Sequence, residues 1–166
     1  MNFRWTFFPL RVYHDASSGE TIVKILIVED NVMIADLLQE SLQIAGFDVC
    51  GMAGSTSEAI LLGSMHRPDI AVIDLDLGAG GRGTDAAIEL CRQWPIGILF
   101  ASGNGHGSNC DHTGAVAVIG KPYTFESMVA AVMIVHDIAT TGNTARPLPQ
   151  GVRLLHRAPT PAFAPT

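Results

Sequence analysis

Positive charge is scarce in this sequence. The 166 residues include 10 Lys+Arg against 16 Asp+Glu, which gives a formal net charge of −6. Only two of the basic residues are lysines, Lys24 and Lys121. A protein that binds duplex DNA by neutralising its phosphates needs a surplus of basic side chains. The composition therefore argues against a nucleic-acid partner, and it directs attention to each of the two lysines.

Cysteine and long apolar runs are also scarce. The three cysteines, Cys50, Cys91 and Cys110, are odd in number and widely spaced, as expected for reduced thiols in a cytoplasmic protein. No apolar run reaches the roughly 18 residues that a membrane span requires. The first 15 residues lack the apolar stretch and cleavage site of a signal peptide. We therefore expect a cytoplasmic protein without a membrane segment.

Charge and proline divide the chain into three segments. Residues 1–22 balance in charge and are expected to form an N-terminal extension. Residues 23–140 hold 14 acidic against 5 basic residues and are predicted to form one acidic domain. Residues 141–166 hold five of the nine prolines and no acid, a composition typical of a flexible tail.

Strand-like and helix-like patterns alternate through the central segment. The expected strands are 24–28, 48–54, 70–74, 97–101 and 115–119. The expected helices are 32–45, 55–65, 84–94 and 124–139. Such alternation predicts a parallel sheet between two helical layers, because successive parallel strands need helical crossovers. Residues 103–114 lie where one further helix belongs, but their Gly/Asn-rich sequence predicts a short or disordered helix.

Polar side chains follow four of the expected strands. They are Glu29 and Asp30, Asp74 and Asp76, Ser102, and Lys121. The carboxyl ends of parallel strands meet at one edge of a sheet, where ligands of such folds bind. Clustered carboxylates repel one another unless a cation lies among them, and oxygen ligands suit Mg²⁺. A lysine opposite them supplies charge for an anionic group, so the edge suits phosphoryl transfer.

Four segments together resemble the receiver domain of two-component response regulators. They are KILIVEDN (24–31), PDIAVIDLDL (68–77), LFASGN (99–104) and GKPYTFESM (120–128). The resemblance implies a flavodoxin-like, doubly wound α/β fold with a five-stranded parallel sheet in the order 2-1-3-4-5. The Phe100–Gly103 string further resembles an alphaproteobacterial single-domain subgroup, whose hallmark is Phe-Ala-Thr-Gly.

The resemblance also implies roles for the acidic residues. Asp74 corresponds to the phosphoacceptor, and Glu29 and Asp30 to the acidic pair that holds Mg²⁺. Asp74 and the main-chain carbonyl of Asp76 complete the metal ligands. Asp76 is the alternative phosphoacceptor, but Asp74 lies six residues after Pro68, as the family pattern requires, and directly ends the expected strand.

Further roles follow from the same resemblance. Ser102 corresponds to the switch hydroxyl and Lys121 to the ammonium that contacts the phosphoryl group. The side chains of Asp76 and Asn104 are expected to modulate phosphoryl hydrolysis. The bond between Lys121 and Pro122 is expected to be cis, which an X-Pro bond permits at low cost.

The sequence departs from the family pattern at three places. Gly78 replaces the usual proline after the phosphoacceptor, and Val118 replaces the aromatic switch residue three positions before Lys121. The Gly/Asn-rich segment 103–114 replaces the fourth helix. Phosphorylation remains the expectation, whereas these departures affect the surface that would carry the signal onward.

Two other motifs occur in the sequence. Residues 78–83 match the dinucleotide fingerprint G-x-G-x-x-G, but they follow the third expected strand, lie behind two carboxylates and lack an acid about 20 residues later. His106, Cys110 and His112 have a spacing compatible with zinc, but no second ligand group accompanies them. We favour a solvated loop for these three residues.

We therefore expect a stand-alone response regulator receiver rather than an enzyme with its own substrate. It would take a phosphoryl group from a sensor histidine kinase or a phosphotransfer protein onto Asp74, with Mg²⁺ as cofactor. No helix-turn-helix follows residue 140, so the signal would pass to a downstream protein by contact. The alternative is a degenerate receiver that serves as an unphosphorylated binding scaffold.

Overall fold

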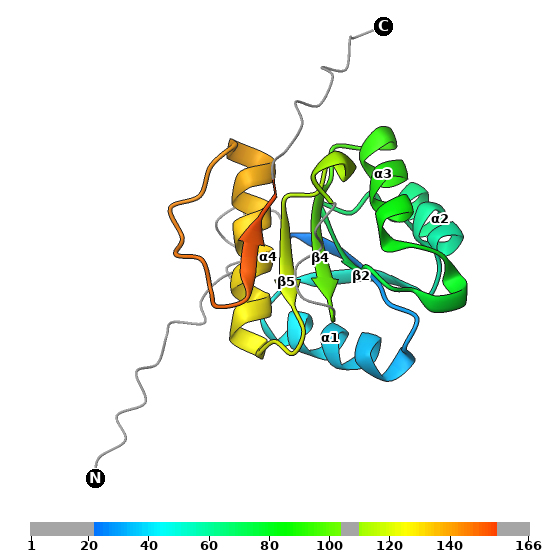
Figure 1. Cartoon of the computed structure of the whole chain (residues 1–166), viewed down its shortest axis with the longest axis horizontal. Helices are drawn as coiled ribbons and strands as arrows, with labels where there is room; N and C mark the ends of the chain where they lie inside the picture. The colour runs from blue at the N-terminus through cyan, green and yellow to red at the C-terminus, as the bar shows by residue number, and fades with distance from the viewer. Residues whose placement is uncertain (1–21, 104–109, 156–166) are drawn as a thin grey trace, which may run out of the picture.

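The fold is built on one twisted sheet. A computed structural model describes residues 22–103 and 110–155. The strands are β1 (Lys24–Val28), β2 (Asp48–Ala53), β3 (Ile70–Asp74), β4 (Gly97–Ser102), β5 (Ala117–Gly120) and β6 (Val152–Leu154). Their order is β2-β1-β3-β4-β5-β6, and β1 to β5 are mutually parallel (Figure 1). The expected α/β flavodoxin-like sheet is confirmed, with one strand more than predicted.

Four α-helices are present in the described residues. They are α1 (Val32–Ile44), α2 (Thr56–His66), α3 (Gly83–Gln93) and α4 (Phe125–Thr141). Side chains of Asn31, Ser55 and Thr124 cap three of them, because each accepts a hydrogen bond from a main-chain N–H of the first turn. No helix in residues 22–103 or 110–155 is long and apolar enough to cross a membrane.

The helices cover both faces of the sheet (Figure 1). In β1, Ile25 and Ile27 belong to the apolar cluster beneath α1 and α4, whereas Leu26 and Val28 belong to the cluster beneath α2 and α3. All four are fully buried. A strand covered on both faces needs apolar residues at every position, which explains the uninterrupted runs in the sequence.

The described part of the connection from β4 to β5 contains no α-helix. Among its described residues, the regular structure is a 3-10 turn, η2 (Asp111–Thr113). Thr113 is buried, and its hydroxyl donates a hydrogen bond to the main-chain oxygen of Cys110. The expected disorder of the fourth helix concerns residues 103–114, of which 104–109, including Asn104 and His106, lie outside the described residues.

The sixth strand was not predicted. We expected a flexible tail over residues 141–166, but Val152–Leu154 pairs antiparallel with β5, with Val118 opposite Arg153. Pro147 and Pro149 precede β6 and the other three prolines of this stretch follow it in sequence, so none removes a donor from its ladder. The edge of β5 supplies hydrogen bonds to this segment, and Leu155, which is 7% exposed, supplies a buried apolar contact. Composition alone reveals neither.

Two leucine truncations should separate core from surface. Leu90 of α3 is fully buried, whereas Leu61 of α2 is 59% exposed. We expect Leu90→Ala to lower the free energy of unfolding by about 2–5 kcal/mol, because it removes buried methyl groups and leaves a cavity. Leu61→Ala should change it by about 0.5 kcal/mol or less. Urea denaturation followed by circular dichroism measures both, and equal effects would contradict the assigned core.

Candidate functional site

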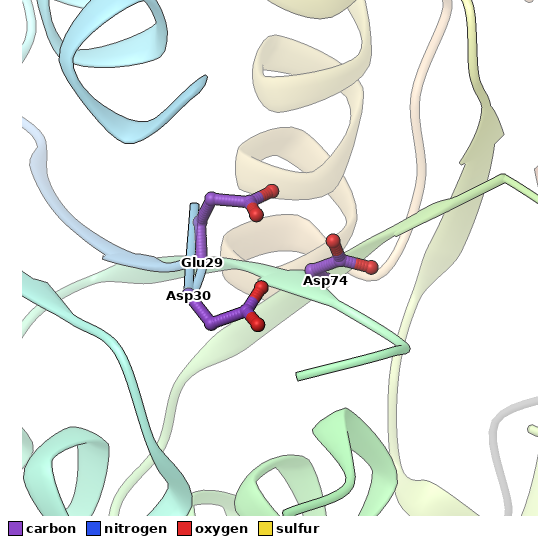
Figure 2. Close-up of side chains that lie close together, drawn as sticks. All are labelled: Glu29, Asp30 and Asp74. Carbon is purple, nitrogen blue, oxygen red and sulfur yellow. The ribbon is translucent and has the colours of Figure 1, made fainter. Parts of the chain in front are cut away.

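Three carboxyl groups meet at the carboxyl ends of β1 and β3. Glu29 and Asp30 directly follow β1, and Asp74 is the last residue of β3. β1 and β3 are parallel neighbours with Val28 opposite Ile73, so the residues that follow them lie side by side. Carboxylate oxygens of the three acids lie within 4.8 Å of one another, and Figure 2 shows the three side chains grouped together.

The three acids differ in burial. Glu29 is 7% exposed and Asp74 is 8% exposed, whereas Asp30 is exposed. Burial raises the pKa of Glu29, and the negative charge of Asp74 acts in the same direction. The main-chain N–H of Asn31, which donates to Glu29 Oε1 at 3.1 Å, and the charge of Lys121 oppose this shift without cancelling it.

Lys121 brings the positive charge to this cluster. Its Nζ lies 2.6 Å from Asp74 Oδ2 and 3.3 Å from Glu29 Oε2. Burial alone would lower the pKa of Lys121, but its hydrogen bonds to Asp74 and Glu29 and their charges together raise it above the ordinary value. The ammonium therefore stays protonated. The site holds one ammonium and three carboxyl groups, so the charge of Lys121 does not balance that of the acids and a further cation would be favourable.

The backbone around Lys121 ties it to β4. The main-chain N–H of Lys121 donates to the main-chain oxygen of Ser102 at 2.7 Å, and the Lys121–Pro122 peptide bond is cis. Ser102 is buried and ends β4, with its neighbour Ala101 paired to Asp74. Parallel register thus brings Ser102 and Lys121 to the same edge as the acids, as the sequence predicts.

Asp76 lies beside the three acids but outside their cluster. Its main-chain N–H donates to Asp74 Oδ1 at 3.0 Å, and its own Oδ1 accepts from the N–H of Gly78 at 3.2 Å. Asp74 is therefore held from two sides, by the Asp76 N–H and by the Lys121 ammonium. The carboxylate of Asp76 instead orders the turn after β3.

The glycines after β3 serve close packing. Gly78 has φ +53°, a conformation closed to the proline that the family pattern would place there, since proline holds φ near −65°. A Cβ on Gly80 would lie 2.4 Å from the main-chain oxygen of Gly54. A Cβ on Gly83 would lie 2.0 Å from the main-chain oxygen of Asp74. The glycines of the dinucleotide match at 78–83 are thus explained by a positive φ at Gly78 and by close backbone approach at Gly80 and Gly83.

Gly83 is a residue of the site that sequence reasoning missed. It starts α3, and its N–H donates to the main-chain oxygen of Leu75 at 3.2 Å. Any side chain there would displace the main chain of the phosphoacceptor candidate Asp74. The glycine spacing is visible in the sequence, where it resembles a dinucleotide-binding motif, but no local signal shows which backbone lies against Gly83.

The donor set fits a magnesium ion. Glu29, Asp30 and Asp74 offer only carboxylate oxygens, the ligands that hard divalent cations prefer. Within residues 22–103 and 110–155, no other cluster of three acidic, histidine or cysteine side chains is close enough to hold a metal. The zinc spacing around Cys110 and His112 includes His106, which lies outside the described residues.

Comparison with known proteins agrees with this geometry. Residues 25–133 match the family model of the response regulator receiver domain. The transcriptional regulatory protein PdtaR of Mycobacterium tuberculosis is 32% identical over 112 residues, which cover 66% of this chain and 54% of PdtaR. The phyllosphere-induced regulator PhyR of Methylorubrum extorquens is 30% identical over 84 residues, which cover 50% of this chain and 32% of PhyR. The chain thus spans about half the length, or less, of these curated relatives.

Solved structures share the fold. The signal receiver domain of a modulated diguanylate cyclase from Desulfovibrio desulfuricans G20 has a TM-score of 0.68 at 22% identity, covering 74% of this chain and 100% of that one. A response regulator from Burkholderia pseudomallei with a phosphorylated aspartic acid and a calcium ion has a TM-score of 0.62 at 26% identity, covering 71% of this chain and 69% of that one. Site, fold and family model agree, and this chain belongs to the response regulator receiver domain family, the phosphoacceptor modules of two-component signalling.

Proposed function

We propose that this receiver accepts a phosphoryl group on Asp74 from a sensor histidine kinase or a phosphotransfer protein. The observation that carries the proposal is the position of Asp74, which contacts Lys121 at 2.6 Å and lies within 4.8 Å of Glu29 and Asp30. Receiver domains receive phosphate from histidine kinases, and the family match supports the same donor class here. The protein would act as a stand-alone cytoplasmic regulator that signals through contact with a downstream protein.

The side chains of the site suit the transfer. A carboxylate oxygen of Asp74 forms the new O–P bond while the P–N bond to the donor imidazole breaks, and the imidazole nitrogen keeps the electron pair. The Asp76 N–H and the Lys121 ammonium hold the Asp74 carboxylate for attack. Lys121 also offers its charge to the phosphoryl oxygens, and Ser102 at the adjoining strand end offers a hydroxyl.

Magnesium would be held by Glu29, Asp30, Asp74 and the main-chain carbonyl of Asp76. When bound, the ion supplies positive charge that offsets the charge of the phosphoryl oxygens. The fit rests on the oxygen-only donor set and on the surplus of carboxyl groups over ammonium groups. The phosphorylated aspartic acid and calcium ion of the Burkholderia pseudomallei relative support an acidic site of this kind.

A degenerate, unphosphorylated scaffold is the second candidate. Val118, which stands at the aromatic switch position, is 2% exposed and belongs to the apolar cluster beneath α2 and α3. Its small buried side chain leaves no ring to move between two positions. The absence of a ring at this position favours the scaffold, whereas the grouping of Glu29, Asp30 and Asp74 beside Lys121 supports phosphorylation. The modulating roles of Asp76 and Asn104 remain predictions.

Phosphorylation of the isolated protein tests the function directly. Incubation with acetyl phosphate and Mg²⁺ should raise the intact mass by one phosphoryl group, because Asp74 is the nucleophile. Asp74→Asn should abolish this increase. Asp76→Asn should retain it, and this matched variant resolves the choice between the two aspartates. A wild-type mass that stays unchanged would favour the scaffold.

Metal binding gives an independent test. Mg²⁺ should raise the thermal midpoint of the wild type, because a ligand that binds only the folded state stabilises it. Asp30→Asn should abolish that effect and, without metal, raise stability by about 1 kcal/mol or less, because it removes repulsion among the acids. Asp36→Asn on α1 changes another exposed aspartate, outside the site, and serves as the control. Calorimetry with and without Mg²⁺ measures the thermal midpoint of the wild type and of both variants. An undiminished Mg²⁺ effect in Asp30→Asn would contradict the role of Asp30 as a ligand.

A further inference from the structure

Residues 142–155, here called the C-terminal strap, return from the end of α4 to the edge of the sheet. Figure 1 shows them looping out from α4 and re-entering beside β5 as β6. The strap is fastened at its start by Asp137 of α4. Arg146 Nε donates to Asp137 Oδ2 at 2.8 Å, and the Thr144 hydroxyl donates to the same oxygen at 3.0 Å.

The strap pairs with β5 over a short stretch. β6 is three residues long, and two further main-chain hydrogen bonds extend it, from Gly120 N to Gly151 O and from Leu155 N to Val116 O, both 2.9 Å. Leu155 is buried and Val152 is partly buried against the core, whereas Leu154 is 38% exposed. Segments with few buried apolar contacts open locally at a low free-energy cost. The strap is therefore a candidate for local release while the rest of the domain stays folded.

A cavity of about 420 Å³ lies where the strap passes the candidate phosphorylation site. One wall is formed by the strap residues Gln150, Gly151 and Arg153. The other walls include Val118 and the turn from Lys121 to Thr124. Gly151 and Arg153 thus border a hollow, whereas Val152 between them packs against the apolar cluster beneath α1 and α4. Lys121 belongs both to this hollow and to the acidic site.

Adjacent peptide groups connect the site to the strap. The N–H of Lys121 binds the main-chain oxygen of Ser102, and the N–H of the preceding Gly120 binds the main-chain oxygen of Gly151. Ser102 and Lys121 are the two residues expected to contact the phosphoryl group. A phosphoryl group on Asp74 adds size and charge where the Lys121 ammonium now lies. A movement of the main chain at Lys121 or Ser102 would therefore also move the Gly120 peptide, whose N–H binds Gly151.

We propose that the C-terminal strap is an autoinhibitory cover of the β5 edge, which phosphorylation of Asp74 releases. The inference rests on the proposed function, since it takes Asp74 as the phosphoacceptor. In the resting state the edge of β5 is occupied by this chain's own residues 152–154. Release frees the main-chain donors and acceptors of β5, and such an edge is a template for pairing with another strand. Phosphorylation would thereby control access to a surface of the sheet.

Hydrogen exchange of the full chain tests the proposal, with intact mass measured on the same samples. After acetyl phosphate and Mg²⁺, the amides of residues 151–155 should exchange about tenfold faster, whereas those of β1 should be unchanged. Phosphorylation of Asp74 with no change in these amides would overturn the inference and leave the proposed function intact. Absence of the phosphoryl mass would overturn both, so the two failures are distinguishable.

A pair of arginine variants tests the fastening without phosphorylation. Arg146→Ala removes the ion pair with Asp137, so exchange in residues 151–155 should rise in the resting protein. Arg92→Ala removes an ion pair of the same kind, with Glu89 on α3, and should leave those amides unchanged. Equal exchange in Arg146→Ala and the wild type would overturn the assignment of the strap as a releasable cover.

Discussion

The contact of Lys121 with Asp74 and Glu29 is the interaction on which the site depends. Two carboxyl groups are buried at the sheet edge, and burying a charge is costly unless an opposite charge or a hydrogen bond accompanies it. The ammonium of Lys121 supplies the opposite charge to both. Lys121 directly follows β5, which is separated from β3 by β4 in the sheet. The third carboxyl group, on Asp30, leaves an excess of negative charge that favours a divalent cation.

Sheet register and loop packing make that contact possible. Parallel pairing of β1, β3 and β4 places Glu29, Asp74 and Ser102 at a common edge, so small errors of register would scatter them. The turn after β3 is equally constrained, since Gly80 and Gly83 lie against main-chain oxygens of Gly54 and Asp74. Gly78, which stands where the family pattern leads one to expect proline, has φ +53°, and the acidic edge is formed all the same.

The C-terminal segment changes the view of how such a domain would signal. A buried Val118 replaces the aromatic residue expected there, and the opposite position on the added strand is Arg153. The same strand borders a cavity that Lys121 also lines. Strand β6 and this cavity adjoin the turn that carries Lys121, whereas the contacts of Thr144 and Arg146 with Asp137 lie near the other end of α4. Strand β6 is an addition to the five-stranded sheet that the family resemblance implies.

Local sequence determined much of the fold. The buried runs around Ile25, Ile70 and Ile98 fit strands covered on both faces, and the capping residues Asn31, Ser55 and Thr124 mark where helices begin. These signals are local, because they depend on side-chain period and on hydrogen bonds within one turn. The acids, Ser102 and Lys121 could be assigned to one edge from strand ends alone.

Tertiary structure alone decided the remaining features. Strand β6 exists because the β5 edge lies beside it, and nothing in the proline-rich composition of residues 141–166 encodes that proximity. Gly80 lies against the main-chain oxygen of Gly54, which is distant in sequence. Gly83 lies against that of Asp74, and only the folded turn between them brings the two together. Composition and periodicity describe what a segment prefers by itself, whereas edge pairing and close backbone approach depend on which segments the fold brings together.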